Sequence, residues 1–547
     1  MTTTTPSLAR SSVLMASGSV VSRMLGVVRQ SLLVYAIGQG LVGNAFQTAN
    51  TLPNVIYMLI AGGVLNSVLV PQLVRAAKNP DGGRDYTDRI ITLAMAGFLV
   101  VTVVCTIGAG VLVRLYSQNL SGDALSLATF FAVLTVPQIL FYGLYALLGQ
   151  VLNARGQFAA FGWSPVLANV VSIIGLLAFL GLYDGHTAPG SWTSGMVWLF
   201  AGTATLSIAA QGIFLLIPLW RSGFRWTPRF GMRGVGLRAT SNVAGWAFAA
   251  LVVSQLGYLV ASNVMWHASN QTGEVGRFVP GVSVYNSALF VFMVPHGFVA
   301  LSVITAIYPR VSAAVHDGDT ATVRREYVRG LLVPAALTMP ATFALVVFSA
   351  PIVHFLFTSK DPAELPATQL TLSAMAAAVI PFGIDVLNQR FFFAYERGRT
   401  ALAEQLVLSV SAVLVTLSAL LLSPWYAVPL IGLGIVVSNV LAALFGMRVV
   451  GRTVGGLPVR RITSAYARMA LAALVASAVA FPLQLLLGHV TGEGRWGALL
   501  TLGVGGAAFG VVYLLMARVL DIREVADLAD RVLIRLPSRQ RRGRHES

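Results

Sequence analysis

Long apolar runs separated by short polar breaks fill the chain from about residue 13 to residue 517. A helix needs about 20 apolar residues to cross the hydrocarbon core of a bilayer. The pattern therefore predicts an all-α polytopic membrane protein with about fourteen transmembrane helices. The predicted spans are residues 13–37, 45–73, 91–115, 123–151, 158–182, 193–219, 240–265, 280–308, 328–357, 367–393, 400–422, 426–449, 464–488 and 496–517.

Composition agrees with a membrane protein, because 56% of the 547 residues are hydrophobic and only 10% are charged. Soluble domains carry roughly 25% charged residues. The first apolar run is longer than a signal-peptide core and no small-residue cleavage pattern follows it, so we expect no separate signal peptide. The single cysteine, Cys105, excludes an internal disulfide and a cysteine metal cluster.

The net charge of +17 is distributed by topology. Arginines gather in alternate breaks, at residues 75–89, 221–238, 310–329 and 448–461, whereas the other breaks hold few cations. This positive-inside pattern predicts a multi-pass protein of the cytoplasmic (plasma) membrane with both termini cytoplasmic. It also makes nucleic acid an unexpected partner, since topology accounts for the excess charge.

Two landmarks recur along the chain. Pro309 closes the eighth span as Pro71 closes the second, and "FAYERGRTA" at 393–401 repeats "VLNARGQFA" at 151–159. The two pairs have almost the same separation in sequence, which predicts two six-helix lobes related by a parallel repeat, a transporter feature. We assign residues 1–230 to the N-terminal lobe, 231–455 to the C-terminal lobe, 456–520 to two extra helices and 521–547 to a basic cytoplasmic tail.

Arg23 and Arg29 lie in the first span, in "SRMLGVVRQSLL", and no other charged residue occurs between Val13 and Leu73. An arginine at the membrane centre costs about 2.5–3.5 kcal/mol on insertion scales. A water-filled cavity between the lobes would relieve that cost, and guanidinium groups suit phosphate oxygens. We therefore predict a cavity for a phosphate-bearing substrate; the alternative is a structural role, with the arginines bound to backbone carbonyls or lipid headgroups.

Other polar residues of the spans are candidates for the same cavity. Those expected to contact substrate are Asn44, Asn54, Tyr57, Tyr285 and His296. Asp385 either pairs structurally with Arg390 or Arg397, or serves as a proton relay in coupling.

The sequence carries no Walker loop, no His-Glu-x-x-His motif and no Gly-x-Ser-x-Gly elbow. We therefore expect a transporter and not an enzyme, with no cofactor and no metal. An ATP-driven pump would need a nucleotide-binding domain, for which the chain has no room.

Several motifs carry a resemblance to a known family: "SRMLGVVRQSLL", "LPNVIYMLIAGGVLNSVLVPQLV", "VPHGFVALSVITAIYPRVS" and "QRFFFAYERGRT". In this order they resemble the MurJ (MviN) family of lipid II flippases, in the multidrug/oligosaccharidyl-lipid/polysaccharide exporter superfamily. "YNSALFVFMVPHG" is similar to the actinobacterial branch. The resemblance covers residues 10–520.

The resemblance implies two lobes around a V-shaped central cavity, with helices 13 and 14 forming a groove for a polyprenyl tail. It implies translocation of lipid II, a diphosphate-linked disaccharide peptide, from the inner to the outer leaflet by alternating access. Arg23 and Arg29 match the two first-helix cavity arginines of the family. Membrane lipids and cell-wall synthesis or division proteins are further expected partners.

The chain departs from the family pattern at several positions. Asn44 stands where many members have an acidic residue, Tyr57 where they have an arginine, and no arginine lies near Leu289. The membrane parts of helices 7 and 11 have no acidic residue, which argues against a sodium site. Two alternatives stay open: an exporter of another polyprenyl-diphosphate glycan or of drugs, and a non-transporting scaffold for cell-wall synthesis.

Overall fold

The computed structural model describes residues 8–61, 84–155, 157–185, 188–231, 242–272, 276–297, 301–492 and 494–526. The later part of the predicted span 45–73 and most of the predicted tail 521–547 lie outside the described residues. Within these ranges the chain is helical and contains no strand. Helices satisfy all their backbone groups internally, which the absence of water in a bilayer core requires.

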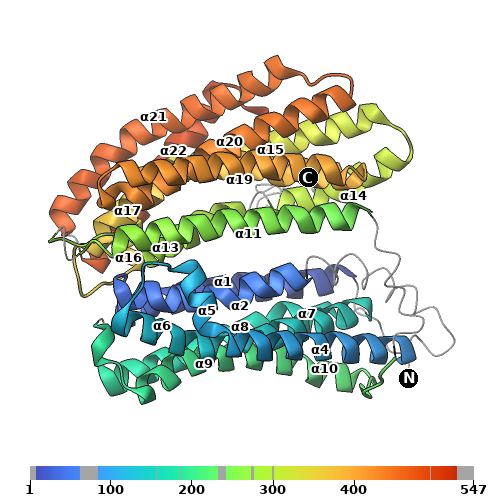
Figure 1. Ribbon diagram of the computed structural model, residues 1–547. Helices are drawn as coiled ribbons and strands as arrows, with labels where there is room; N and C mark the ends of the chain where they lie inside the picture. Colours follow the sequence, from blue (N-terminus) through green and yellow to red (C-terminus); the bar gives the residue numbers. More distant parts are fainter. Residues whose placement is uncertain are drawn as a thin grey trace, which may run out of the picture. The chain divides into compact units, whose positions relative to one another are not determined.

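The helices follow one another along the chain with short connections (Figure 1). The first half contains α1 (Leu8–Ile37), α2 (Leu41–Ile60), α4 (Arg84–Ile107), α5 (Ala109–Tyr116), α6 (Gly122–Thr135), α7 (Gln138–Ala154), α8 (Phe158–Tyr183), α9 (Ser194–Phe214) and α10 (Leu216–Arg221). The second half contains α11 (Asn242–Ser269), α13 (Val282–Pro295), α14 (Leu301–His316), α15 (Thr320–Val347), α16 (Ser349–Leu356), α17 (Glu364–Ala376), α18 (Val379–Ala394), α19 (Gly398–Ser418), α20 (Ala427–Thr453), α21 (Val459–Thr491) and α22 (Arg495–Val519).

The described residues include eleven helical segments that are long and apolar enough to cross a membrane. The α17–α18 pair, bent by 50°, adds a twelfth if it forms one span. The two remaining predicted spans coincide with α2 and with α13 plus α14, each of which adjoins residues outside the described ranges. An all-α, multi-pass architecture is confirmed, while the count of fourteen and the V-shaped cavity stay predictions.

Helix breaks recur with the period of the predicted repeat. Helix α4 gives way to α5 at residue 108, and α15 gives way to α16 at residue 348. The α6–α7 break at residues 136–137 and the α17–α18 break at residues 377–378 have almost the same separation in sequence. Arg155 and Tyr395, which end α7 and α18, have nearly the same backbone angles, φ −94° and ψ 5° against φ −90° and ψ 7°. The repeat therefore extends to the places where the helices break.

The described residues form two compact units. The first comprises Met1–Ser287, Leu356–Thr368 and Gly398–Ile431, and the second comprises Ala288–Phe355, Gln369–Arg397 and Gly432–Ser547. In the first unit α1 packs along α8, and α11 packs along α19. This grouping follows contacts, whereas the predicted lobes follow the repeat, so the lobe boundaries stay a prediction.

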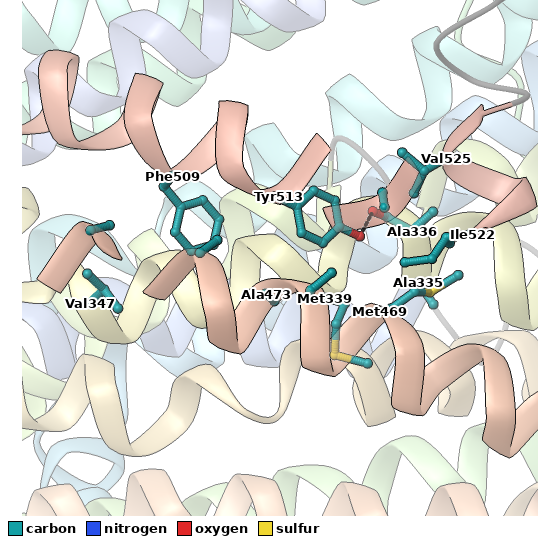
Figure 2. Close-up of a cluster of buried hydrophobic side chains, with 14 of the residues drawn as sticks. Ala335, Ala336, Met339, Val347, Met469, Ala473, Phe509, Tyr513, Ile522 and Val525 are labelled. Carbon is teal, nitrogen blue, oxygen red and sulfur yellow. Dashed lines mark hydrogen bonds between the residues drawn. The ribbon is translucent and has the colours of Figure 1, made fainter. Parts of the chain in front are cut away.

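In the second unit, α21 and α22 pack against α15 around a buried hydrophobic cluster (Figure 2). Pro340 inside α15 has no N–H, so the carbonyl of Ala336, four residues earlier, lacks its helical partner. Tyr513 of α22 donates its hydroxyl hydrogen bond to that carbonyl at 2.9 Å (Figure 2). Tyr466 of α21 donates in the same way to the carbonyl of Leu331 at 3.0 Å. Apolar packing and tyrosine hydrogen bonds thus join the last two helices to α15.

Candidate functional site

Helix α2 carries a row of polar side chains inside an otherwise apolar segment. Asn50, Asn54 and Tyr57 are spaced by four and three residues, which places them on one face of the helix. The row continues toward the helix start with Gln47, whose Oε1 accepts a hydrogen bond from Asn286 at 3.5 Å. Two residues predicted from the sequence, Asn54 and Tyr57, therefore share this face.

Pro53 interrupts the backbone hydrogen bonds of α2 beside this row. Its ring leaves the carbonyl of Ala49, four residues earlier, without a helical N–H donor. Thr135, the last residue of α6, donates its hydroxyl to that carbonyl at 3.0 Å. The proline is thus accommodated by a side chain from a neighbouring helix, at the level where α6 ends.

Gln138 is the centre of the polar contacts at the α6–α7 break. Its side chain is 1% exposed, and its amide group makes hydrogen bonds in three directions. Nε2 donates to Oδ1 of Asn50 at 3.1 Å and to the Thr205 hydroxyl at 3.3 Å. Oε1 accepts from the Tyr142 hydroxyl at 3.4 Å. Helices α2, α7 and α9 are therefore joined by one buried amide.

Arg29 of α1 lies at the end of this hydrogen-bonded chain. The Tyr142 hydroxyl is within electrostatic range of its guanidinium group, and the rings of Tyr57 and Tyr142 have centroids 5.5 Å apart. Arg29 is half-buried, and none of the ion pairs among the described residues includes it. A cation within a membrane span whose neighbours are neutral hydroxyl and amide groups will attract an anion.

Arg23 lies six residues before Arg29 and is also half-buried. Its neighbour Ser22 accepts hydrogen bonds from Nδ2 of Asn169 at 3.0 Å, through both its carbonyl and its hydroxyl oxygen. This contact holds that part of α1 against α8. Six residues correspond to about 120° around a helix, so the two arginines leave α1 on different faces. That both bind one anion stays a prediction.

Asn44 and Tyr285 are buried and lie where α2 meets the start of α13. Asn44 is 1% exposed, and its Oδ1 accepts the backbone N–H of Ser283 at 2.8 Å, which satisfies a first-turn donor of α13. Tyr285 is close to Tyr258, whose hydroxyl is within hydrogen-bonding reach of Thr51. These contacts give Asn44 a structural role, and contact of either residue with substrate stays a prediction.

His296, in the second unit, packs among aromatic rings. Its imidazole meets the ring of Phe382 edge-on, with centroids 4.5 Å apart, and Phe382 also contacts Phe292. The histidine is buried, so this environment favours packing, and its predicted contact with substrate stays untested.

Asp385 and Arg390 do not form an ion pair within the described residues. Asp385 is 4% exposed, and its Oδ2 accepts a hydrogen bond from Gln389 at 3.1 Å. Arg390 is exposed and lies over the ring of Tyr308, with its guanidinium carbon 5.5 Å from the ring centroid. Structural pairing of Asp385 with an arginine, one of the two predicted roles, is therefore absent in this conformation.

The structure thus brings Arg29 and Tyr57 together through Tyr142, which the sequence prediction missed together with Gln138. A signal for both was available, since they are polar residues four positions apart that directly follow Pro137 in an apolar run. Their convergence on Arg29 depends on α1, α2 and α7 meeting, which no local pattern reveals.

Comparison with known proteins now assigns this arrangement. Residues 33–497 match the family described as "Lipid II flippase MurJ". The chain belongs to the MurJ family. A probable lipid II flippase MurJ of Rhizobium meliloti (strain 1021) is 26% identical over 396 residues, covering 69% of this chain and 69% of that protein. The lipid II flippase MurJ of Burkholderia cenocepacia is 24% identical over 372 residues, covering 67% and 68%.

Solved structures agree in fold. The structure of "Lipid II flippase MurJ, inward closed conformation" has a TM-score of 0.70 at 18% identity and covers 93% of this chain and 99% of its own. A multidrug resistance MATE family transporter of the MOP superfamily, in an inward-facing conformation, has a TM-score of 0.59 at 17% identity and covers 81% and 98%. The expected MurJ family and its superfamily are confirmed. The family match begins after Arg23 and Arg29, so their correspondence with the MurJ cavity arginines stays a prediction.

Proposed function

We propose that this protein is a lipid II flippase, which moves the lipid-linked peptidoglycan precursor from the inner to the outer leaflet of the cytoplasmic membrane by alternating access. Membership of the MurJ family supports this assignment, as do the relatives that are named lipid II flippases. The charge distribution along the chain supports a position with both termini in the cytoplasm.

The observation that carries the substrate assignment is the position of Arg29. Its charge lies in a membrane span among neutral hydroxyl, aromatic and amide groups, and no carboxylate of the described residues pairs with it. A diphosphate supplies the missing negative charge, and a guanidinium group binds phosphate oxygens through a matching fork of N–H donors. Lipid II, with its diphosphate link, fits this requirement.

The polar network behind Arg29 has a distinct task in this proposal. Gln138 fixes the Tyr142 hydroxyl, and Tyr142 in turn is adjacent to Arg29. Buried amide networks of this kind hold their members in one arrangement because each unmade hydrogen bond is costly in a low dielectric. Arg29 would therefore meet the diphosphate in a preset orientation, with Asn54 and Tyr57 nearby on α2 as further contacts.

Complementation with direct measurement of transport tests the proposal. The full chain is expressed in a bacterium whose own flippase can be depleted, and lipid II accessible at the outer face is measured after depletion. We expect growth and outward exposure of lipid II to recover together. The empty vector serves as the control, with the abundance of the protein in the membrane measured in parallel.

Two outcomes would contradict this proposal. Recovery of growth without outward exposure of lipid II would indicate a scaffold for cell-wall synthesis. Export of a different polyprenyl-diphosphate glycan, with lipid II left inside, would indicate a related exporter.

A further inference from the structure

A second group of arginines lies in the second unit, at the end of α15 that begins with Thr320. Arg324, Arg325 and Arg329 of α15 and Arg461 in the first turn of α21 line one pocket of about 770 Å³. All four side chains are exposed. Four guanidinium groups around one pocket repel one another unless an anion lies between them.

The acidic groups near this pocket are mostly engaged elsewhere. Glu326 lies within 3.8 Å of Arg310 on α14, on another side of α15. Asp319 accepts the backbone N–H of Thr322 at 2.9 Å and caps the start of α15. Glu524 is the one acidic side chain among the described residues that line the pocket. The pocket therefore carries a clear excess of positive charge.

The remaining wall of the pocket is apolar, formed by Val328, Leu332, Val333 and Pro458. The arginines occupy the first turns of α15 and α21, and both helices continue from there as apolar candidate membrane spans. The hydrogen bond from α21 to the carbonyl of Leu331 holds the two helices together just beyond the pocket. The pocket thus lies where a charged helix end passes into hydrocarbon, and it offers a basic and an apolar surface side by side.

We propose that this pocket binds the headgroup of an anionic phospholipid, with the phosphodiester among the arginines and the start of an acyl chain along Leu332 and Val333. Basic pockets at the ends of membrane helices are recognised lipid-headgroup sites, and each arginine near a membrane surface contributes about 1 kcal/mol toward an anionic lipid. Free phosphate would use the arginines and leave the apolar wall uncovered. The pocket shares no residue with the Arg29 network, so the lipid would act as a bound ligand of the second unit.

The test uses the purified full-length protein in a neutral detergent. Native mass spectrometry measures how many molecules of phosphatidylglycerol it retains and with what apparent Kd, with phosphatidylcholine and inorganic phosphate as comparison ligands. We expect phosphatidylglycerol to bind preferentially. The triple variant Arg324→Gln/Arg329→Gln/Arg461→Gln should weaken it by roughly tenfold or more, since each lost arginine costs about fivefold.

A matched control removes the same charge elsewhere on the unit. Arg448→Gln/Arg452→Gln/Arg460→Gln alters three exposed arginines that do not line the pocket, and its affinity should stay within about twofold.

Glu524→Gln removes the one carboxylate of the lining and should tighten binding by several-fold, a gain that misfolding cannot produce. Equal loss in the two triple variants, no gain in Glu524→Gln, equal retention of phosphatidylcholine, or protection by inorganic phosphate alone would each overturn the proposal. Displacement of phosphatidylglycerol by lipid II at this pocket would also overturn it, because the pocket would then be a substrate site.

Discussion

Two proline breaks, one in each unit, pose the same physical problem and have the same solution. Pro53 in α2 leaves the carbonyl of Ala49 without its helical donor, and Pro340 in α15 does the same to Ala336. In each case a hydroxyl from a neighbouring helix donates to the carbonyl, at 3.0 Å in the first unit and 2.9 Å in the second.

The surroundings of the two breaks are different. One residue after Ala49, Asn50 begins the chain of contacts that runs through Gln138 and Tyr142 to Arg29. The hydroxyl that reaches Ala336 belongs to a tyrosine within an apolar cluster, where the last two helices pack on α15 (Figure 2). A proline in a membrane helix is therefore weak evidence for a binding site. A buried polar network that ends on a cation without a carboxylate partner is much stronger evidence.

The largest effect should follow from removing that cation. Arg29→Ala removes the charge that holds the diphosphate, so outward exposure of lipid II per molecule should fall by about tenfold or more, the value of a lost charge-assisted contact. Arg29→Lys keeps the charge and loses the fork of donors, so partial activity should remain. Activity is measured as lipid II exposure divided by membrane abundance.

Arg114→Ala, at an exposed arginine of α5, is the matched control and should transport normally. Normal transport by a stable Arg29→Ala protein would leave the first unit without a reason to differ from the second.

The amide that organises the network should come next. Gln138→Leu keeps the volume and removes the partners of Asn50, Thr205 and Tyr142, so transport should fall by about fivefold, in line with one or two lost hydrogen bonds. The counterpart of Gln138 in the repeat is Val379, which also begins a helix after a break and is fully buried.

Val379→Ala is the matched control, because it should lower thermal stability by about 1–3 kcal/mol through a cavity and leave transport per folded molecule unchanged. If Val379→Ala impairs transport as much as Gln138→Leu, both breaks take part in transport, and the polar network is not what separates them.

The difference between the two units also marks the limit of prediction from sequence. The apolar runs predicted the positions of the helices well, because a membrane span is a local property of one continuous apolar segment. The breaks at residues 136–137 and 377–378 were missed, since a bent span and a straight one have the same hydropathy. The matching offset of these breaks became visible only with the backbone angles.

The candidate site was predicted in part. Arg29 and Tyr57 could be selected because a cation or a tyrosine in an apolar run needs an explanation. Asn44 was selected on the same grounds, but its polarity serves the backbone N–H of Ser283 at the start of α13. Polarity in a span shows that a partner exists, and only the neighbouring helices show whether that partner is the backbone, another side chain or a ligand.

A smaller effect, on stability, should follow from removing either hydroxyl that serves a proline break. Tyr513→Phe and Thr135→Val each leave a buried carbonyl without a donor, which costs about 1–3 kcal/mol. Both should lower the melting temperature of the purified protein. Transport per folded molecule should fall only in Thr135→Val, because Ala49 adjoins Asn50. Loss of transport in Tyr513→Phe as well would show that the break in α15 is also functional.

The smallest effect is expected at Asp385 in the second unit. Asp385→Asn keeps the size of the side chain and an oxygen that accepts the hydrogen bond from Gln389. Arg390 lies over Tyr308 and is not paired with this carboxylate, so neutralising it strands no charge. Both stability and lipid II exposure should therefore stay within about twofold of the unmodified protein. A proton relay makes the opposite prediction, because an amide cannot take up and release a proton as a carboxylate does. Loss of transport in a stable Asp385→Asn protein, with Arg390→Gln still active, would place part of the transport chemistry in the second unit and end the contrast with the first.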